Sequence, residues 1–134
     1  MSEKPAYFDL KTDLWKKGWE NAKNYEDFLA SAPIEHKARW DESLKRSPDL
    51  TIQQKERLKG YNRILRILLV GGTWCMDCSR SGPYIKKIVE DCDSKVELRF
   101  IDRETLPELR DELRIMGAPR VPSVIFLNEE WFEA

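Results

Sequence analysis

Hydrophobic positions follow two different patterns along the chain. Before residue 63 they recur at near-helical spacing, as in Leu10, Leu14, Trp15 and Trp19. After residue 63, short apolar runs alternate with amphipathic stretches, which is typical of strands and helices in turn. The pattern therefore predicts a helical region over residues 1–62, packed on an α/β region over residues 63–134.

The first region carries its own helix start and stop signals. Asp9–Ala22 is predicted as a helix, and Asn24 is expected to cap a short turn after it. Proline two residues after Ser31 predicts another helix start, before Ile34–Lys45. Thr51–Gln54 matches a capping box, and a glycine follows at residue 60 as a stop for that last helix.

Three tryptophans stand out in the helical region, Trp15, Trp19 and Trp40. Large aromatic side chains contribute much of the energy of cores and interfaces, so we expect these three to anchor helices on a neighbouring surface. At least one of them is expected to pack on the sheet or on the helix predicted at residues 77–91.

The second region alternates strands and helices. The predicted strands are Ile64–Val70, Val96–Asp102 and Ser123–Leu127, and the predicted helices are Asp77–Asp91, with Pro83 inside it, and Thr105–Ile115, opened by a capping box. Strand–helix–strand order predicts a partly parallel sheet with right-handed crossovers. In such sheets functional groups gather at the carboxyl end of a central strand.

Composition excludes several classes of function. The net charge is −1, with 41% hydrophobic and 35% charged residues, so no strong field attracts nucleic acid or anionic lipid. No window approaches the ~18 consecutive apolar residues of a membrane span. Met1–Pro5 leads into polar sequence without an apolar core, so we expect no secretory signal, no membrane association and a cytoplasmic location.

Cys75 and Cys78 form a Cys-x-x-Cys pair where the first predicted strand turns into a helix. The helix start favours a thiolate on the first sulfur, and the second lies about one turn on. We interpret the pair as a redox dithiol. Half of a zinc site is the alternative, but it would need Cys92 and His36, which have no metal-like spacing. Cys92 is instead expected to be buried and structural, and His36 to be a solvated surface residue.

Residues 63–132 resemble a thioredoxin fold, on three features at matching places. These are Trp74–Cys78 after an apolar strand, Pro83 eight residues past Cys75, and Arg120–Ser123 before the strand that ends at Leu127. Residues 31–102 also resemble a bacterial thioredoxin-like group in which helices precede the dithiol. The expected fold class is therefore α/β, a three-layer thioredoxin-like fold with an N-terminal helical extension.

The resemblance implies roles for several residues. Cys75 would be the attacking thiolate and Cys78 the resolving thiol. Pro122 would be cis and would hold the backbone of Val121 against the dithiol, where an extended substrate segment pairs. Trp74 would shield the sulfurs from one side. The implied partners are a disulfide-containing protein or small thiol and a recycling reductase. No cofactor beyond the redox-active disulfide and no bound metal is expected, and the protein is expected to be a monomer.

The sequence also departs from the thioredoxin pattern. Asp77 stands between the cysteines, where it would oppose a thiolate on Cys78, relay its proton, or simply favour the helix dipole. Leu69 occupies the place of a buried aspartate. The chain stops after Ala134, so the last strand and helix of a thioredoxin fold are expected to be missing or shortened. Either the sequence is shortened, or the N-terminal helices cover the face that this helix would cover.

Two functions remain open on these grounds. The first is a thiol–disulfide oxidoreductase that uses Cys75 and Cys78 to reduce or exchange disulfides. The second is a non-catalytic thioredoxin-fold binding module, or a redox- or metal-sensing site. The sequence does not identify the substrate, the recycling reductase or the direction of electron flow.

Overall fold

The computed structural model describes residues 9–134, so the expectation about Met1–Pro5 lies outside it. Within that range the chain forms six helices and three strands. The helices are Thr12–Glu20 (α1), Tyr25–Ala30 (α2), Ile34–Arg46 (α3), Ile52–Lys59 (α4), Met76–Glu90 (α5) and Pro107–Glu112 (α6). The strands are Leu65–Gly71 (β1), Val96–Asp102 (β2) and Ser123–Leu127 (β3).

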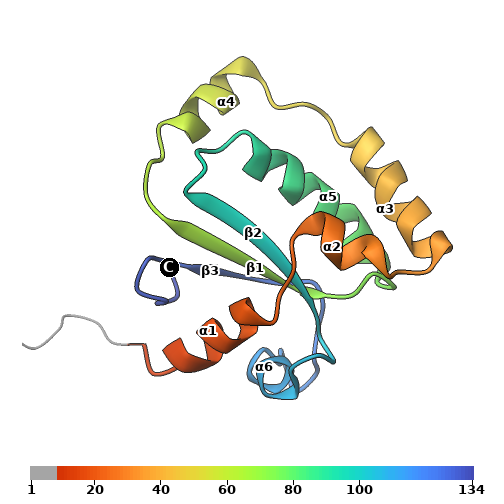
Figure 1. The fold of residues 1–134 in the computed structure, drawn as a ribbon, viewed down its shortest axis with the longest axis vertical. Coiled ribbons are helices and arrows are strands. Elements are labelled where there is room, and N and C mark those ends of the chain that lie inside the picture. Colours follow the sequence, from red (N-terminus) through yellow and green to blue (C-terminus); the bar gives the residue numbers. More distant parts are fainter. Residues whose placement is uncertain (1–8) are drawn as a thin grey trace, which may run out of the picture.

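The strands form one sheet in the order β2-β1-β3, with β1 in the centre (Figure 1). β1 and β2 are parallel, from Leu65 opposite Val96 to Gly71 opposite Asp102. β3 runs antiparallel to β1 on its other side. The parallel pair is connected through α5, as a βαβ unit requires. The carboxyl end of β1 therefore leads, at the middle of the sheet, directly into the loop before α5.

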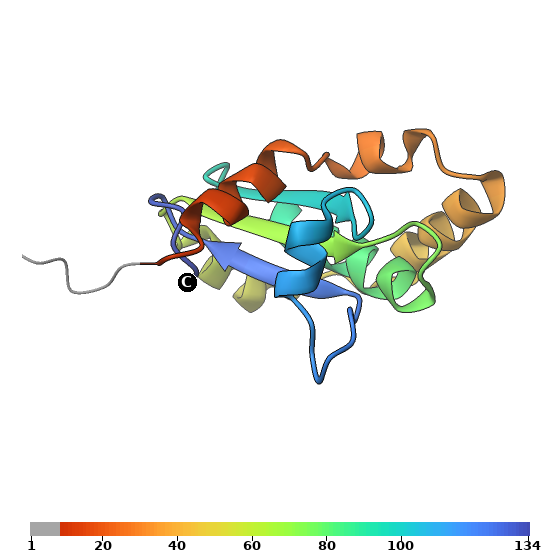
Figure 2. The ribbon, with the colours of Figure 1, turned by 90° about the horizontal axis from the view of Figure 1, so that it is seen from below.

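Alternating side chains of β1 supply two cores. Ile67 and Leu69 face a cluster shared with α2, α3 and α5, whereas Leu68 and Val70 face a cluster shared with α1 and α6. Figure 2 shows α1 and α6 lying over one face of the sheet. The result is the expected three-layer arrangement of helices, sheet and helices.

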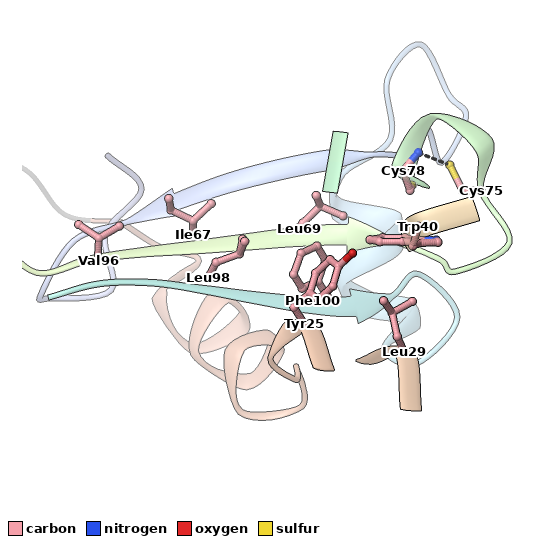
Figure 3. Close-up of a cluster of buried hydrophobic side chains, with 10 residues drawn as sticks. All are labelled: Tyr25, Leu29, Trp40, Ile67, Leu69, Cys75, Cys78, Val96, Leu98 and Phe100. Carbon is pink, nitrogen blue, oxygen red and sulfur yellow. Dashed lines mark hydrogen bonds between the residues drawn. The ribbon is translucent and has the colours of Figure 1, made fainter. Parts of the chain in front are cut away.

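Aromatic rings dominate the first core (Figure 3). Trp40 is fully buried and lies edge-on to Phe100, with ring centroids 5.9 Å apart. A Cβ atom on Gly82 would lie 2.4 Å from Cζ3 of Trp40, so α3 packs closely on α5 only because residue 82 is glycine. Trp40 thus packs on both the sheet and α5, which was the expectation for at least one tryptophan.

The second core is completed by α1. Trp15 and Trp19 are buried there against the sheet and α6. The guanidinium of Arg99 lies 4.5 Å from the ring centroid of Trp19, which adds a cation–π contact at the rim. All three tryptophans of the N-terminal region therefore anchor helices, as the sequence predicts.

Several helix boundaries follow the predicted signals. Asn24 caps α2 through its side chain, Thr51 forms a capping box with Gln54, and Gly60 ends α4. α3 begins at Ile34 as predicted, with Pro33 in the N-cap position and no side chain capping the helix.

The predicted capping box at Thr105 is wrong. Leu106 is the N-cap of α6, no side chain caps that helix, and Pro107 stands in its first turn. Thr105 instead donates its backbone N–H to Asp102 in the turn that follows β2. The helix also ends at Glu112 rather than near Ile115, because Ile115 pairs with Ala118 in an isolated bridge.

β3 is the last strand of the described chain. After it, Oδ1 of Asn128 accepts the N–H groups of Glu130 and Phe132 in a turn, and Glu133 pairs back with Leu127. Along residues 9–134, every helix is too short or too polar to cross a membrane.

Candidate redox site

Cys75 occupies the N-cap position of α5, and its Sγ accepts the backbone N–H of Cys78 at 3.1 Å (Figure 3). A sulfur at a helix N-cap faces unpaired N–H groups and the positive end of the helix dipole, which both favour a thiolate. Both cysteines are free thiols. Cys75 is 7% exposed and Cys78 is fully buried, so the first sulfur is the more accessible one.

Cys78 lies one turn further, beneath the end of β1. A Cβ atom on Gly71 would lie 2.5 Å from its Sγ, so the sulfur uses the space that a glycine leaves. Burial of the thiol and its hydrogen bond with Cys75 raise its pKa to about 12. The nearby charge of Asp77 acts in the same direction. Cys78 is therefore a protonated thiol near neutral pH.

The ring of Trp74 packs closely against the loop before Cys75. A Cβ atom on Gly72 would fall 2.1 Å from Nε1 of the indole, which shows how closely the ring covers that residue. Nε1 donates to Oδ2 of Asp102 at 3.1 Å, and the guanidinium of Arg103 lies 4.8 Å from the ring centroid. The ring remains 38% exposed. Trp74 is thus held beside the end of β2 and stays partly exposed to solvent.

Helix α3 contacts the loop before Cys75 through one of its faces. Nδ1 of His36 lies 3.0 Å from Oγ1 of Thr73, and Nε1 of Trp40 donates to the carbonyl oxygen of Thr73, also at 3.0 Å. Nη1 of Arg39 lies 3.0 Å from Sδ of Met76 and 3.4 Å from the carbonyl oxygen of Trp74. These contacts lie between segments more than thirty residues apart in the chain.

The expectation that His36 is a solvated surface residue is wrong. It is half-buried and touches the loop that carries the dithiol. Its polar neighbours in the sequence suggested a surface position. However, His36 lies one helical turn before Trp40, so both side chains are on the same face of α3, and Trp40 is buried. The 36/40 spacing beside a buried tryptophan was the signal available in the sequence.

The segment before β3 completes the surroundings. The Val121–Pro122 peptide bond is cis, the geometry expected from the sequence. Val121 is half-buried and packs against the cluster that contains both dithiol cysteines. Arg103 donates to the carbonyl oxygen of Pro119 at 3.2 Å, which ties this segment to the end of β2 beside Trp74.

The remaining candidates lie further from the sulfurs or in the solvent. Asp77 is exposed in the first turn of α5. Leu69 is fully buried, so the core beneath the dithiol is apolar at that position. Cys92 is half-buried rather than buried as expected, because it follows the end of α5, where its Sγ lies 3.4 Å from the carbonyl oxygen of Ile88.

The zinc alternative needs Cys92 and His36 to converge on the pair. Cys92 follows the C-terminal end of α5, whereas Cys75 and Cys78 stand at its start, roughly 20 Å away for a helix of this length. Among residues 9–134 no group of three or more His, Cys, Asp or Glu side chains is placed to hold a metal ion.

Comparison with known proteins agrees with this geometry. Residues 22–134 match the model of a thioredoxin family. The chain belongs to the thioredoxin family. The close cysteine pair in this family setting supports a redox-type function. None of the curated proteins compared with it is a significant match.

Two solved structures are similar to this thioredoxin-family chain. One is a protein of unknown function, PA1234, from Pseudomonas aeruginosa, and the other is an HIV epitope-scaffold. Each has a TM-score of 0.76 and 21% sequence identity, and the match covers 88% of this chain and 72% of the other. At this identity the likeness supports the fold alone.

Proposed function

We propose that the protein is a thiol–disulfide oxidoreductase in which Cys75 attacks and Cys78 resolves. The observation that carries the proposal is the position of Cys75 Sγ at the N-cap of α5, with the Cys78 thiol buried one turn behind it. This arrangement places one accessible sulfur at the start of a helix and one protonated sulfur within reach of it. A dithiol divided in this way suits two-step disulfide exchange.

In the first step the Cys75 thiolate attacks one sulfur of a target disulfide. An S–S bond forms between Cys75 and the target, the target disulfide breaks, and the leaving target thiolate takes up a proton. Cys78 then loses its proton and attacks Cys75 Sγ, which releases the second target sulfur as a thiol. Two electrons and two protons pass to the target, and the Cys75–Cys78 disulfide remains for a partner reductase to reduce.

The raised pKa of Cys78 makes its deprotonation the demanding part of the second step. Asp77 is the titratable side chain nearest in sequence, and it is exposed in the first turn of α5. We propose that Asp77 or water accepts this proton, because Leu69 provides no carboxylate on the buried side.

Trp74, Val121 and Pro122 are proposed to form the contact surface for the target. Trp74 is partly exposed, and Val121 lies against the cluster that holds the dithiol. An extended target segment that contains a disulfide would lie between Trp74 and Val121. Its main chain would pair with exposed backbone, as in peptide recognition by strand addition. The proposed targets are protein disulfides or small disulfides.

The test is trapping of mixed disulfides. Cys78→Ser should accumulate adducts between Cys75 and disulfide-containing targets such as insulin, because attack remains and resolution is lost. Cys75→Ser should accumulate almost none, and Cys92→Ser serves as the matched control with unchanged behaviour. The wild type should accelerate insulin reduction by dithiothreitol. Equal trapping by both dithiol variants, or no acceleration together with tightly bound zinc, would favour a binding or metal-sensing module instead.

A further inference from the structure

The face of α3 that contacts the dithiol loop carries a positive charge whose role the proposed function does not explain. Three of its side chains, at positions 36, 39 and 40, all touch residues 73–76. His36 and Trp40 contact Thr73, whereas Arg39 brings its guanidinium to the residues on either side of Cys75. We propose that Arg39 is a positioning residue that stabilises the Cys75 thiolate and so sets the redox poise of the dithiol. This inference rests on the dithiol exchange proposed above.

The contacts of Arg39 lie on both sides of the attacking cysteine. Its Nη1 lies 3.4 Å from the carbonyl oxygen of Trp74 and 3.0 Å from the sulfur of Met76, the residues immediately before and after Cys75. One nitrogen that reaches both neighbours must lie close to the residue between them. Within residues 9–134 no carboxylate lies within salt-bridge distance of Arg39, so its charge is not neutralised by a direct partner.

The rest of α3 keeps this charge in place. Trp40 is fully buried and donates to the Thr73 carbonyl, which fixes the helix against the loop. His36, one turn earlier, meets the hydroxyl of the same threonine. Arg39 is half-buried between these two anchors and is therefore restricted to the loop side of the helix. A side chain held in this way needs little further ordering to act on the sulfur.

Other charges near Cys75 do not replace Arg39. Cys78 is protonated and donates its backbone N–H to Cys75 Sγ. Asp77, on α5, has the wrong sign to favour a thiolate. At the end of β2 the carboxylate of Asp102 and the guanidinium of Arg103 both contact Trp74, so their opposite charges partly cancel there. These charged and titratable groups around the loop are Arg39 and His36 on α3, Asp77 and Cys78 on α5, and Asp102 and Arg103 at the end of β2.

The charge acts differently on the two redox states. A nearby guanidinium stabilises the thiolate of the reduced protein but has little effect on the neutral Cys75–Cys78 disulfide. Arg39 should therefore increase the thiolate fraction of Cys75 near neutral pH and favour the reduced form, which raises the reduction potential. Without it the dithiol would be a slower nucleophile and a stronger reductant at equilibrium.

The experiment compares Arg39→Gln with Arg39→Lys in a Cys92→Ser background. Arg46→Gln is the matched control, because Arg46 is exposed on the same helix and pairs with Glu42 rather than with the loop. The thiolate is followed by its ultraviolet absorbance against pH and by the rate of alkylation with iodoacetamide at pH 7. Arg39→Gln should lower the alkylation rate roughly 3- to 10-fold and shift the titration to higher pH. Arg39→Lys should stay within about twofold of wild type, because a lysine keeps the charge.

Two results would overturn the inference. One is an Arg39→Gln variant that titrates like wild type. The other is an Arg39→Lys variant that loses as much as Arg39→Gln, which would indicate packing rather than charge. If Arg39→Gln does not fold, the wild type still provides a test, because raising the salt concentration should slow alkylation of Cys75 and leave a control thiol peptide unaffected. A rate that does not depend on salt would then reject the proposal. These readouts need no disulfide target, so failure of exchange activity would reject the proposed function without affecting them.

Discussion

Gly71 and Cys78 show how much of the site depends on single residues. The last residue of β1 lacks a Cβ atom where the resolving sulfur sits, and that sulfur is fully buried. Glycine is needed at residue 71 because no space remains for a Cβ atom beside Cys78 Sγ, and not because of glycine's backbone flexibility. Burial in turn keeps Cys78 protonated, so a packing detail at residue 71 sets the chemistry of residue 78.

Substitution of Gly71 by alanine tests this coupling. The added methyl would lie 2.5 Å from Cys78 Sγ and 3.2 Å from Cδ2 of Leu69, and neither atom can move away freely in the core. We expect a loss of about 1–3 kcal/mol in the free energy of unfolding, measured by urea denaturation, together with altered reactivity of the dithiol. Gly60→Ala is the control, since its nearest contact would be 3.4 Å and its backbone is helical, so it should be neutral or slightly stabilising. A Gly71→Ala variant as stable and reactive as wild type would contradict the argument.

At the same scale the sequence predicted the dithiol but not its neighbours. Cys75 and Cys78 were predicted from a local motif at the turn from a strand into a helix, whereas Trp74 and Pro122 were predicted from the resemblance to thioredoxins. His36 and Arg39 were not, because their contacts with residues 73–76 depend on how α3 docks, which no local pattern specifies. The Gly71–Cys78 contact was missed because it depends on how α5 packs against the end of β1, which no local pattern specifies either.

At the scale of elements, the packing of α3 on α5 links the N-terminal region to the redox loop. Trp40 enters the space left by Gly82 and at the same time hydrogen-bonds to Thr73. The side chain thus combines a structural role with a position beside the dithiol. Removing the indole N–H of Trp40 lowers the stability of the fold if the carbonyl oxygen of Thr73 is then left without a hydrogen-bond partner.

Replacing Trp40 with phenylalanine should separate the two roles. The smaller ring keeps part of the packing but loses the hydrogen bond to the Thr73 carbonyl, so we expect a loss of about 1–3 kcal/mol in unfolding free energy. We also expect a changed alkylation rate of Cys75, because the loop is no longer fixed. Trp19→Phe is the matched control, since Trp19 is also buried, in the other core and away from the dithiol. It should cost stability without altering Cys75. An equal effect of both variants on Cys75 would mean that only global stability matters.

The elements themselves were largely predictable, for identifiable reasons. β2 and β3 have the predicted bounds because alternation and apolar runs end at clear turn residues. α6 was misplaced because Thr105 has the sequence of a helix cap but is used in the turn after β2, so a non-local turn overrides the local signal. Boundaries fail where a residue has two possible hydrogen-bonding partners.

For the whole molecule, the N-terminal helices are tied to the α/β part at several distant points. Lys23 and Phe100 exchange two backbone hydrogen bonds, of 2.7 and 2.8 Å, so the segment between α1 and α2 extends the edge of the sheet at β2. Oδ2 of Asp9 accepts the backbone N–H of Glu133 at 2.9 Å and the indole N–H of Trp15 at 3.1 Å. Together with the packing of Trp40 against α5, these contacts connect residues 9–62 to both faces and one edge of the sheet.

Asp9 also gives this connection a pH dependence. Burial of the carboxyl alone would raise its pKa, but the amides of Glu133 and Lys11 and the indole of Trp15 outweigh this, so the pKa lies below the ordinary 3.8. A carboxyl whose pKa is lowered by folding stabilises the folded state above the unfolded pKa, and this contribution is lost as the pH falls through the folded value. The stabilisation by Asp9 is therefore complete at neutral pH and disappears in acid.

We propose on these grounds that residues 9–62 and 63–134 unfold as one cooperative unit, and Asp9→Asn tests it. The variant should lose about 1.5–3 kcal/mol at pH 7, because hydrogen bonds to a charged acceptor are removed, and the difference from wild type should shrink as the pH falls below 3.8. Hydrogen exchange in a urea series should show peptides from α1 and from β1 losing protection at the same midpoint in both proteins, with both midpoints lowered together in the variant. The contrary result would be an earlier transition for α1 alone, with limited proteolysis before Arg63 releasing a folded and active 63–134 fragment. That outcome would make the helices an appendage and would leave the contacts of α3 with the dithiol without functional weight.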